Sequence, residues 1–489
     1  MNALADLALR CEVIVGSPHV ITGDAVCRYR IGEATPMAAV RPADEREVSR
    51  LLALAWIEGL AVVPWGGGLH QTLGGPPSRY DLALDLTRLD RVVDHQPGDM
   101  TATVQAGIRL GALDDHLGQH GQFLPLDPPR GDQATVGGVL ATNLSGPLRC
   151  RYGTARDLVL GIRIVHADGT ITKGGGRVVK NASAYDIPKL YLGAHGTLGV
   201  IVEATVRVYP RAQAESGEVF AFPDVSAAQA MADRILHSPL VPTRVELVEG
   251  TALRLGGRGS AGLAVTFAGV AESVTYQREA ASEMAASHAG EAVAVAELPE
   301  LLQKLRDFPW ANEDPSSPSR ILKNSYSPRQ LKKVQMQGGE RSEARGVLAG
   351  TSQRLGSAPT QQMGLFQQPG RVLWRGGVLP ADCGKAMEAV QNSSGGGCLV
   401  GTAATVSAGV VRGVIASDDP DRLASSVQAA RRALEALGGY LVLLDAPSRV
   451  RAAASVWGPA PASLSWMQGL RRAFDERAII NPGRFLDGI

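Results

Sequence analysis

The sequence predicts an α+β protein of more than one domain. Three observations predict it: the length of the chain, the repeated change between helical and strand-like apolar patterns, and the glycine clusters that follow strand-like runs. The chain has 489 residues, which is more than one ordinary core encloses, so two or three domains are expected. Its 57 glycines indicate many tight turns.

The first strongly patterned segment, residues 42–60, predicts a helix. Its apolar residues recur at helical spacing, and Asp44 with Glu47 three residues later is typical of a capping box. Gly59 supplies the C-terminal stop. The strand-like run LAVVPW follows directly, so the local order is helix, strand and glycine loop.

The glycine loop, Gly66, Gly67 and Gly68, predicts an anion site, because bare N–H groups after a strand can cradle a phosphate. Neither common nucleotide fingerprint fits it. Gly-x-Gly-x-x-Gly would need glycine where Gln71 stands, and the chain contains no Gly-Lys-Ser/Thr. Rossmann and P-loop sites are therefore excluded, and a purely structural glycine turn stays open as the alternative.

Strand and helix patterns continue to about residue 210, and a second α+β pattern with Ala-rich helices follows. Between residues 81 and 121 we expect two strands, a turn, a third strand and a short helix, and around 167–169 a hairpin turn. Four segments are expected: a helical or extended lead-in (1–34), a first domain (35–211), a cap domain (212–450) and a C-terminal segment that returns to the first domain (451–489).

Composition excludes several classes of function. The 49 Lys and Arg residues balance 48 Asp and Glu, which removes the argument for nucleic-acid binding. The five cysteines form no Cys-x-x-Cys pair, so local spacing supports neither an iron–sulfur cluster nor a zinc ribbon. The start, MNALADLALR, lacks the pattern of a secretory signal, and no apolar run is long enough for a transmembrane segment. We therefore expect a cytoplasmic protein.

Three further elements carry a resemblance to a known family. They are the Gly-Gly element DQATVGGVLATNLSGPLRCRYGTARDLVLG (132–161), the segment KNASAYDIPKLYLGAHGTLGVIVEA (180–204) and the tail INPGRF (480–485). With the glycine loop, their order and spacing resemble the PCMH-type FAD-binding fold of the vanillyl-alcohol oxidase superfamily. More narrowly, the sequence resembles the FAD-binding subunit of bacterial glycolate oxidase. The resemblance covers about residues 35–210 and the extreme C-terminus.

This resemblance implies an α+β, PCMH-type, two-subdomain FAD-binding fold with a second α+β cap domain. It implies one FAD, with its pyrophosphate on residues 66–68. In the superfamily a histidine directly after the loop glycines attaches the flavin covalently. Leu69 occupies that place here, so non-covalent FAD is expected. The resemblance assigns these residues to the cofactor: Trp65, Gly66, Gly67, Gly68, Leu69, His70, Thr135, Val136, Gly137, Gly138, Thr142, Asn143, Ser145, Gly146, Tyr152, Gly153, Gly196, Gly199, Val200, Ile201 and Asn481.

The implied activity is oxidation of glycolate or a related 2-hydroxy acid, within a hetero-oligomer that includes a catalytic flavin subunit and an iron–sulfur subunit. Through such partners the chain would reach the inner membrane. Catalytic members of the superfamily bind a metal with cap-domain histidines, but the last histidine here is His288. No metal and no catalytic base are therefore assigned. Two alternatives stay open: a stand-alone FAD-linked oxidase or dehydrogenase, and a non-catalytic FAD-containing scaffold.

The remaining histidines are interpreted structurally. We expect His195 to pack near the adenine end of the cofactor rather than to act in catalysis. His116 and His120 have the i, i+4 spacing of metal ligands, but no third ligand stands near them in the sequence, so a solvated helix face is the preferred interpretation.

Polar residues outside the glycine motifs leave more than one role open. Arg149 and Arg151 would neutralise a phosphate or lie at a subunit interface. Arg375 would hold a substrate carboxylate, although a surface arginine is the simpler interpretation. Tyr185 and Asp186 are expected to anchor the segment that contains them.

Overall fold

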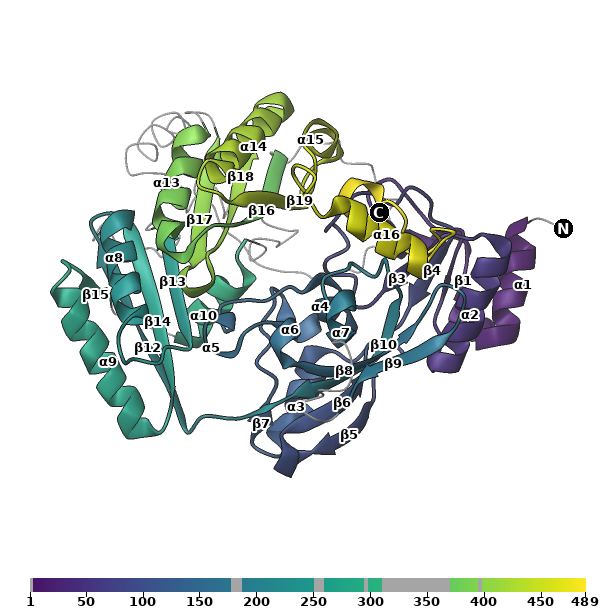
Figure 1. Ribbon diagram of the computed structural model, residues 1–489, viewed down its shortest axis with the longest axis horizontal. Coiled ribbons are helices and arrows are strands. Elements are labelled where there is room, and N and C mark those ends of the chain that lie inside the picture. The colour runs from purple at the N-terminus through teal and green to yellow at the C-terminus, as the bar shows by residue number, and fades with distance from the viewer. Residues whose placement is uncertain (1–2, 177–186, 250–258, 294–297, 310–369, 395–397) are drawn as a thin grey trace, which may run out of the picture.

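The computed structural model describes residues 3–176, 187–249, 259–293, 298–309, 370–394 and 398–489. Within these residues the strands form one mixed sheet of four strands, an antiparallel sheet of five, a two-stranded ribbon and an antiparallel sheet of eight. Figure 1 shows the four-stranded and five-stranded sheets at one end of the molecule and the eight-stranded sheet, with its helices, at the other.

The first subdomain holds the four-stranded sheet. Its strand order is β1 (Val20–Ile21), β2 (Ala38–Val40), β4 (Leu82–Asp85) and β3 (Val62–Trp65), and it packs on α1 (Ala3–Val15) and α2 (Glu45–Glu58). The predicted helix is confirmed as α2. Asp44 caps its first turn and Gly59 ends it in the left-handed conformation. The capping box differs from the expected one by a residue. Glu47 accepts a hydrogen bond from the backbone N–H of Ala43 instead of that of Asp44.

The second subdomain is built on the five-stranded sheet. Its strand order is β5 (Val92–Gln96), β6 (Thr101–Gln105), β10 (Val200–Arg207), β8 (Val159–Val165) and β9 (Ile171–Gly175). Its helices are α3 (Leu110–Gly118), α4 (Val136–Thr142), α5 (Arg149–Tyr152), α6 (Ala155–Leu158) and α7 (Pro188–Tyr191), and the ribbon pairs β7 (Gln122–Phe123) with β11 (Tyr209–Pro210). The predicted hairpin turn at 167–169 is confirmed between β8 and β9.

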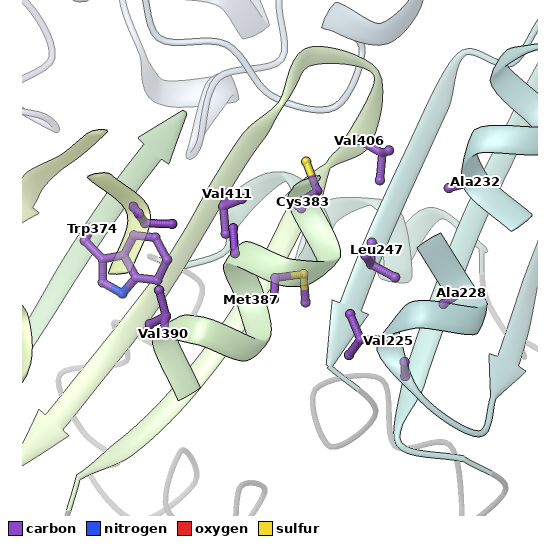
Figure 2. Packing of buried hydrophobic residues seen from close by; sticks show 14 of the residues in the cluster. Val225, Ala228, Ala232, Leu247, Trp374, Cys383, Met387, Val390, Val406 and Val411 are labelled. Atoms are coloured by element: carbon purple, nitrogen blue, oxygen red, sulfur yellow. The ribbon is translucent and has the colours of Figure 1, made fainter. Parts of the chain in front are cut away.

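The cap domain contains the eight-stranded sheet. Its strand order is β15 (Glu291–Val293), β12 (Ala214–Phe222), β14 (Ala261–Gly269), β13 (Arg244–Glu249), β17 (Leu399–Thr405), β18 (Val410–Ser417), β16 (Gly370–Gly377) and β19 (Tyr440–Asp445). Helices α8 (Val225–Leu236), α9 (Ala271–Ala286), α13 (Cys383–Ser393) and α14 (Pro420–Glu435) cover one face. Figure 2 shows this core, in which the fully buried Trp374 ring lies near Val390 and Val411.

The opposite face of the cap sheet meets α10 (Leu298–Asp307) and the FAD-domain side of the molecule. Because side chains alternate along a strand, Leu373 points away from the core that holds Trp374. Leu373 packs instead against Leu73 and Leu144, which precede it by more than two hundred residues. This face of β16 is therefore turned toward the first domain.

The C-terminal segment, with α15 (Ser448–Ala453) and α16 (Leu464–Phe474), crosses back to the first domain, as Figure 1 shows in yellow. Ile480 pairs in parallel with Val62 of β3, so the tail extends the first sheet. A buried ion pair holds this return: Arg471 contacts Asp475 at 3.2 Å, and its guanidinium also donates to the carbonyls of Thr197 and Ile480.

No helix in the described ranges combines the length and the apolarity that crossing a membrane would require. The expected domain boundaries at 35, 212 and 451 stay predictions.

We expect Asp475→Asn to lower the free energy of unfolding by about 3–5 kcal/mol, because it leaves the buried Arg471 guanidinium without its counter-charge. Thermal and denaturant unfolding of the full chain measure this. Glu300→Gln removes one partner of an exposed ion pair with Lys304 and serves as the control, with an expected change below about 1 kcal/mol. Equal effects of the two substitutions would contradict the prediction.

Candidate functional site

A pocket of about 960 Å³, partly open to solvent, lies where the two subdomains and the C-terminal tail meet. Four segments that are distant in sequence line it: the end of β3 with the glycine loop, the start of α4, residues 191–201, and the tail.

The structure brings most of the predicted cofactor residues together in this pocket. Those that line it are Trp65, Gly66, Gly67, Gly68, Leu69, His70, Thr135, Gly137, Gly138, Thr142, Gly196, Gly199, Val200, Ile201 and Asn481. Their contacts with a cofactor stay predictions.

Six predicted residues are placed elsewhere, namely Val136, Asn143, Ser145, Gly146, Tyr152 and Gly153. Val136 is fully buried in the core beneath the pocket. Gly146 lies against Asp127, whose carboxylate accepts from its N–H at 3.2 Å. The ring of Tyr152 packs between Phe123 and Tyr209 instead.

The two glycine elements pack directly against each other. A Cβ on Gly66 would collide with Oγ1 of Thr135, and a Cβ on Gly67 would lie 2.8 Å from the carbonyl oxygen of Gln133. Glycine is therefore needed here for close packing of protein on protein. In the part of the chain that the structure describes, the N–H groups of Gly66, Gly67 and Gly68 donate to no protein acceptor. These donors are available to an anion, and the predicted phosphate cradle stays a prediction.

Two histidines line the pocket in their neutral form. Burial, and then the charge of Arg130, lowers the pKa of His70 to about 4. Burial, and then the charges of Arg484 and Arg375, lowers the pKa of His195 to about 3. Near neutral pH both imidazoles are therefore uncharged.

His195 sits between the pocket and the C-terminal segment. Its ring stacks on Phe485 and meets Trp457 edge to face. Its carbonyl accepts from Nδ2 of Asn481 at 2.5 Å, and Oδ1 of Asn481 is buried without a partner in the described residues. The packed surroundings agree with a structural position for the histidine.

Sequence reasoning missed Gln71 and Arg484, which also line the pocket. Arg484 donates to the carbonyl and the side-chain oxygen of Gln71, and Gln71 in turn donates to Pro64 at 3.2 Å. The signal was present: Arg484 is the one charged residue of INPGRF, the tail motif already assigned to the site.

The pocket suits FAD on its own geometry. The glycine loop offers free N–H donors, Asn481 offers a buried oxygen, and Arg484 offers a buried Nε without a protein partner within the described chain. These groups match a long ligand with an anionic centre and hydrogen-bonding ends. Residues 66–68 would hold its diphosphate, and the neighbouring apolar lining would hold its rings.

Arg375 is half-buried, and its role in holding a carboxylate stays a prediction. Its Nε is buried and has no partner among the described residues, and it lies on the same strand face as Leu373. Its charge reaches both His195 and Arg149, and with burial it lowers the pKa of Arg149. Arg151, by contrast, is exposed. Arg149 and Arg375 thus share one electrostatic environment between the domains.

The structure also adds a third imidazole to His116 and His120. The ring of His95 lies 5.3 Å and 4.9 Å from theirs, a proximity that no pattern in the sequence marks. Across the residues described, however, no group of three or more His, Cys, Asp or Glu side chains is placed to hold a metal ion. Tyr185 and Asp186 lie outside the described residues.

A model of the family described as "FAD binding domain" matches residues 36–175. Among relatives, a probable mitochondrial D-lactate dehydrogenase of Danio rerio is 31% identical over 335 residues, 64% of this chain and 64% of that protein. Glycolate oxidase subunit GlcD of Bacillus subtilis (strain 168) is 28% identical over 47% of this chain and 48% of that protein. The mitochondrial D-lactate dehydrogenase (cytochrome) of Arabidopsis thaliana is 32% identical over 55% and 48%. The chain spans about half the length of the last two relatives.

Solved structures show the same fold along nearly the whole chain. An alkyldihydroxyacetonephosphate synthase superposes with a TM-score of 0.72 at 17% identity, covering 98% of this chain and 84% of that one. p-Cresol methylhydroxylase superposes with a TM-score of 0.68 at 14% identity, covering 99% and 97%. Residues 36–175 therefore match an FAD-binding domain, and the described chain shares the two-domain α+β fold of these solved structures.

Proposed function

We propose that this protein is an FAD-linked oxidoreductase that converts a small 2-hydroxy acid to the 2-oxo acid. Relatives named as D-lactate dehydrogenases and as a glycolate oxidase subunit support the substrate class. The reaction removes a hydride, which carries two electrons, from the carbon that bears the hydroxyl group, and a proton from the hydroxyl itself. Bound FAD supplies the two-electron acceptor, and we propose that it is held without a covalent bond, because Leu69 follows the loop glycines.

The observation that carries this proposal is the unbalanced positive charge of the cap face turned toward the FAD domain. Arg375 and Arg412 lie directly opposite each other on β16 and β18. Arg412 is neutralised by the buried Glu246 at 2.6 Å. Among the described residues, neither Arg375 nor Arg149 has an acidic partner. A half-buried guanidinium without a counter-ion is a suitable site for a substrate carboxylate.

The position of Arg375 agrees with this role. Leu373, two residues earlier on the same face, packs on Leu73, and Leu73 also lines the cofactor pocket. A carboxylate bound at Arg375 would therefore lie at the boundary between cap and cofactor. The substrate carbon attached to it would face the first domain.

A second candidate is an accessory FAD subunit of a larger complex, which passes electrons to an iron–sulfur partner. The absence of any histidine after His288 in the sequence favours it, because residues 289–489 then offer no imidazole base, the group usual in such reactions. The chain's own cysteines lack cluster spacing, so the clusters would belong to the partner.

The visible spectrum of the purified chain during anaerobic titration with glycolate, D-lactate and D-2-hydroxyglutarate tests the proposal. We expect a flavin spectrum that at least one of these acids bleaches. Bleaching by the isolated chain supports the stand-alone enzyme, whereas bleaching only after addition of a co-purified partner supports the accessory subunit. A flavin that none of the acids reduces under either condition would contradict both candidates.

Substitution of Arg375 tests the carboxylate site. We expect Arg375→Met to raise the KM for the hydroxy acid about 10- to 100-fold, because one charge-assisted contact is lost, and Arg375→Lys to lie between it and the wild type. Arg432→Met, on the exposed side of α14, is the matched control and should leave KM unchanged. If Arg375→Met kept the wild-type KM, the carboxylate would bind elsewhere.

A further inference from the structure

We infer that Arg484 is the protein's counter-charge for the diphosphate of FAD, and that Arg451 holds the loop on which this contact depends. The inference concerns the cofactor and not the hydroxy acid, so it stands apart from the proposed reaction. Both residues come from the C-terminal part of the chain, more than 370 residues after the glycine loop.

Arg484 is fixed at the pocket with part of its donor capacity unused. Its side chain donates to the carbonyl of Gly75 at 2.9 Å and to two oxygens of Gln71 at 2.9 and 3.0 Å. A guanidinium has five N–H donors, so these bonds leave two of them free. One of the two is Nε–H, which is buried and has no partner in the described chain.

The charge of Arg484 is not neutralised by the protein. No carboxylate in the described residues forms an ion pair with it, although only 5% of the residue is exposed. Burial, with a contribution from the nearby charge of Arg451, lowers its pKa to about 10, which leaves it fully charged at neutral pH. A buried cation is costly unless an anion accompanies it, so the pocket is incomplete without a negatively charged ligand.

Arg451 holds the loop at residues 72–74 through hydrogen bonds to its carbonyl oxygens. It donates to the carbonyls of Gly74 at 2.7 Å and Thr72 at 2.8 Å, and it contacts Asp445 at 3.3 Å. Thr72 is held a second time, because its hydroxyl donates to the carbonyl of Leu444. Of these two guanidiniums, only that of Arg451 has a carboxylate partner among the described residues, so the charge of Arg484 stays unbalanced beside the loop.

The diphosphate is the part of FAD that this arrangement fits. Arg484 lines the same pocket as Gly66, Gly67 and Gly68, whose N–H groups have no protein acceptor in the described chain. Free backbone donors and an unneutralised guanidinium that line the same pocket are the two components of a phosphate site. The substrate carboxylate is assigned to a different cation, Arg375, on the cap sheet.

Binding of FAD and of inorganic pyrophosphate to the full-length chain freed of flavin tests the inference. We expect Arg484→Met to weaken FAD binding about 10- to 100-fold, as measured by quenching of flavin fluorescence. We also expect it to abolish the competition between pyrophosphate and FAD seen with the wild type. Arg484→Lys keeps the charge and should recover part of both effects.

Arg431→Met is the matched control. Arg431 is also a buried arginine bound to carbonyl oxygens, those of Leu441 and Ser455, but it lies on α14 away from the pocket. We expect it to cost similar thermal stability and to leave FAD and pyrophosphate binding unchanged.

Two results would overturn the inference. One is wild-type affinity of Arg484→Met and Arg484→Lys for FAD and pyrophosphate. The other is a variant that keeps both affinities and changes only the reduction potential of the flavin, which would place Arg484 at the ring system. Neither measurement uses a hydroxy acid, so failure of the proposed reaction would leave the inference intact.

Discussion

The return of the C-terminal tail to β3 is the constraint on which the pocket depends. Residues 479–481 hydrogen-bond to Val62, immediately before the glycine loop, and this pairing sets the positions of Asn481 and Arg484. The buried ion pair of Arg471 and Asp475 stabilises this position of the tail, because removing either charge would leave the other unpaired in a low-dielectric interior. The tail therefore completes both the first sheet and one wall of the site.

Local patterns predicted the elements well, and the pocket less completely. The helix that begins after Asp44 was readable because capping and periodicity agree within a few residues. The glycine elements pointed to the cofactor because their spacing is typical of a family. Contacts created by long-range packing could not be predicted from local sequence. They are the contact between Gly66 and Thr135, the approach of His95 to His116, and the burial of Nε of Arg375. In each case the partner is distant in sequence, and no periodic pattern marks it.

The junction between the cap and the first domain combines an apolar contact with an uncompensated positive charge. One face of the eight-stranded sheet carries Trp374 into the cap core, while the other presents Leu373 and Arg375 to the FAD domain. The apolar contact fixes the domains against each other, and the arginine supplies an uncompensated charge at their junction. A sheet with one face in a core and one face on a ligand can change its substrate contacts without disturbing its own packing.

The hydrogen bonds of Arg451 and Arg484 to the loop at residues 71–75 have a consequence for the order in which the protein folds. The hydrogen bond between Arg484 and Gln71 spans 413 residues. It can therefore form, and fix the conformation of the loop, only after nearly the whole chain has been synthesised. Contacts of such long sequence separation form late and slowly. On the proposed role of Arg484, FAD would bind tightly only after the C-terminal segment has been synthesised.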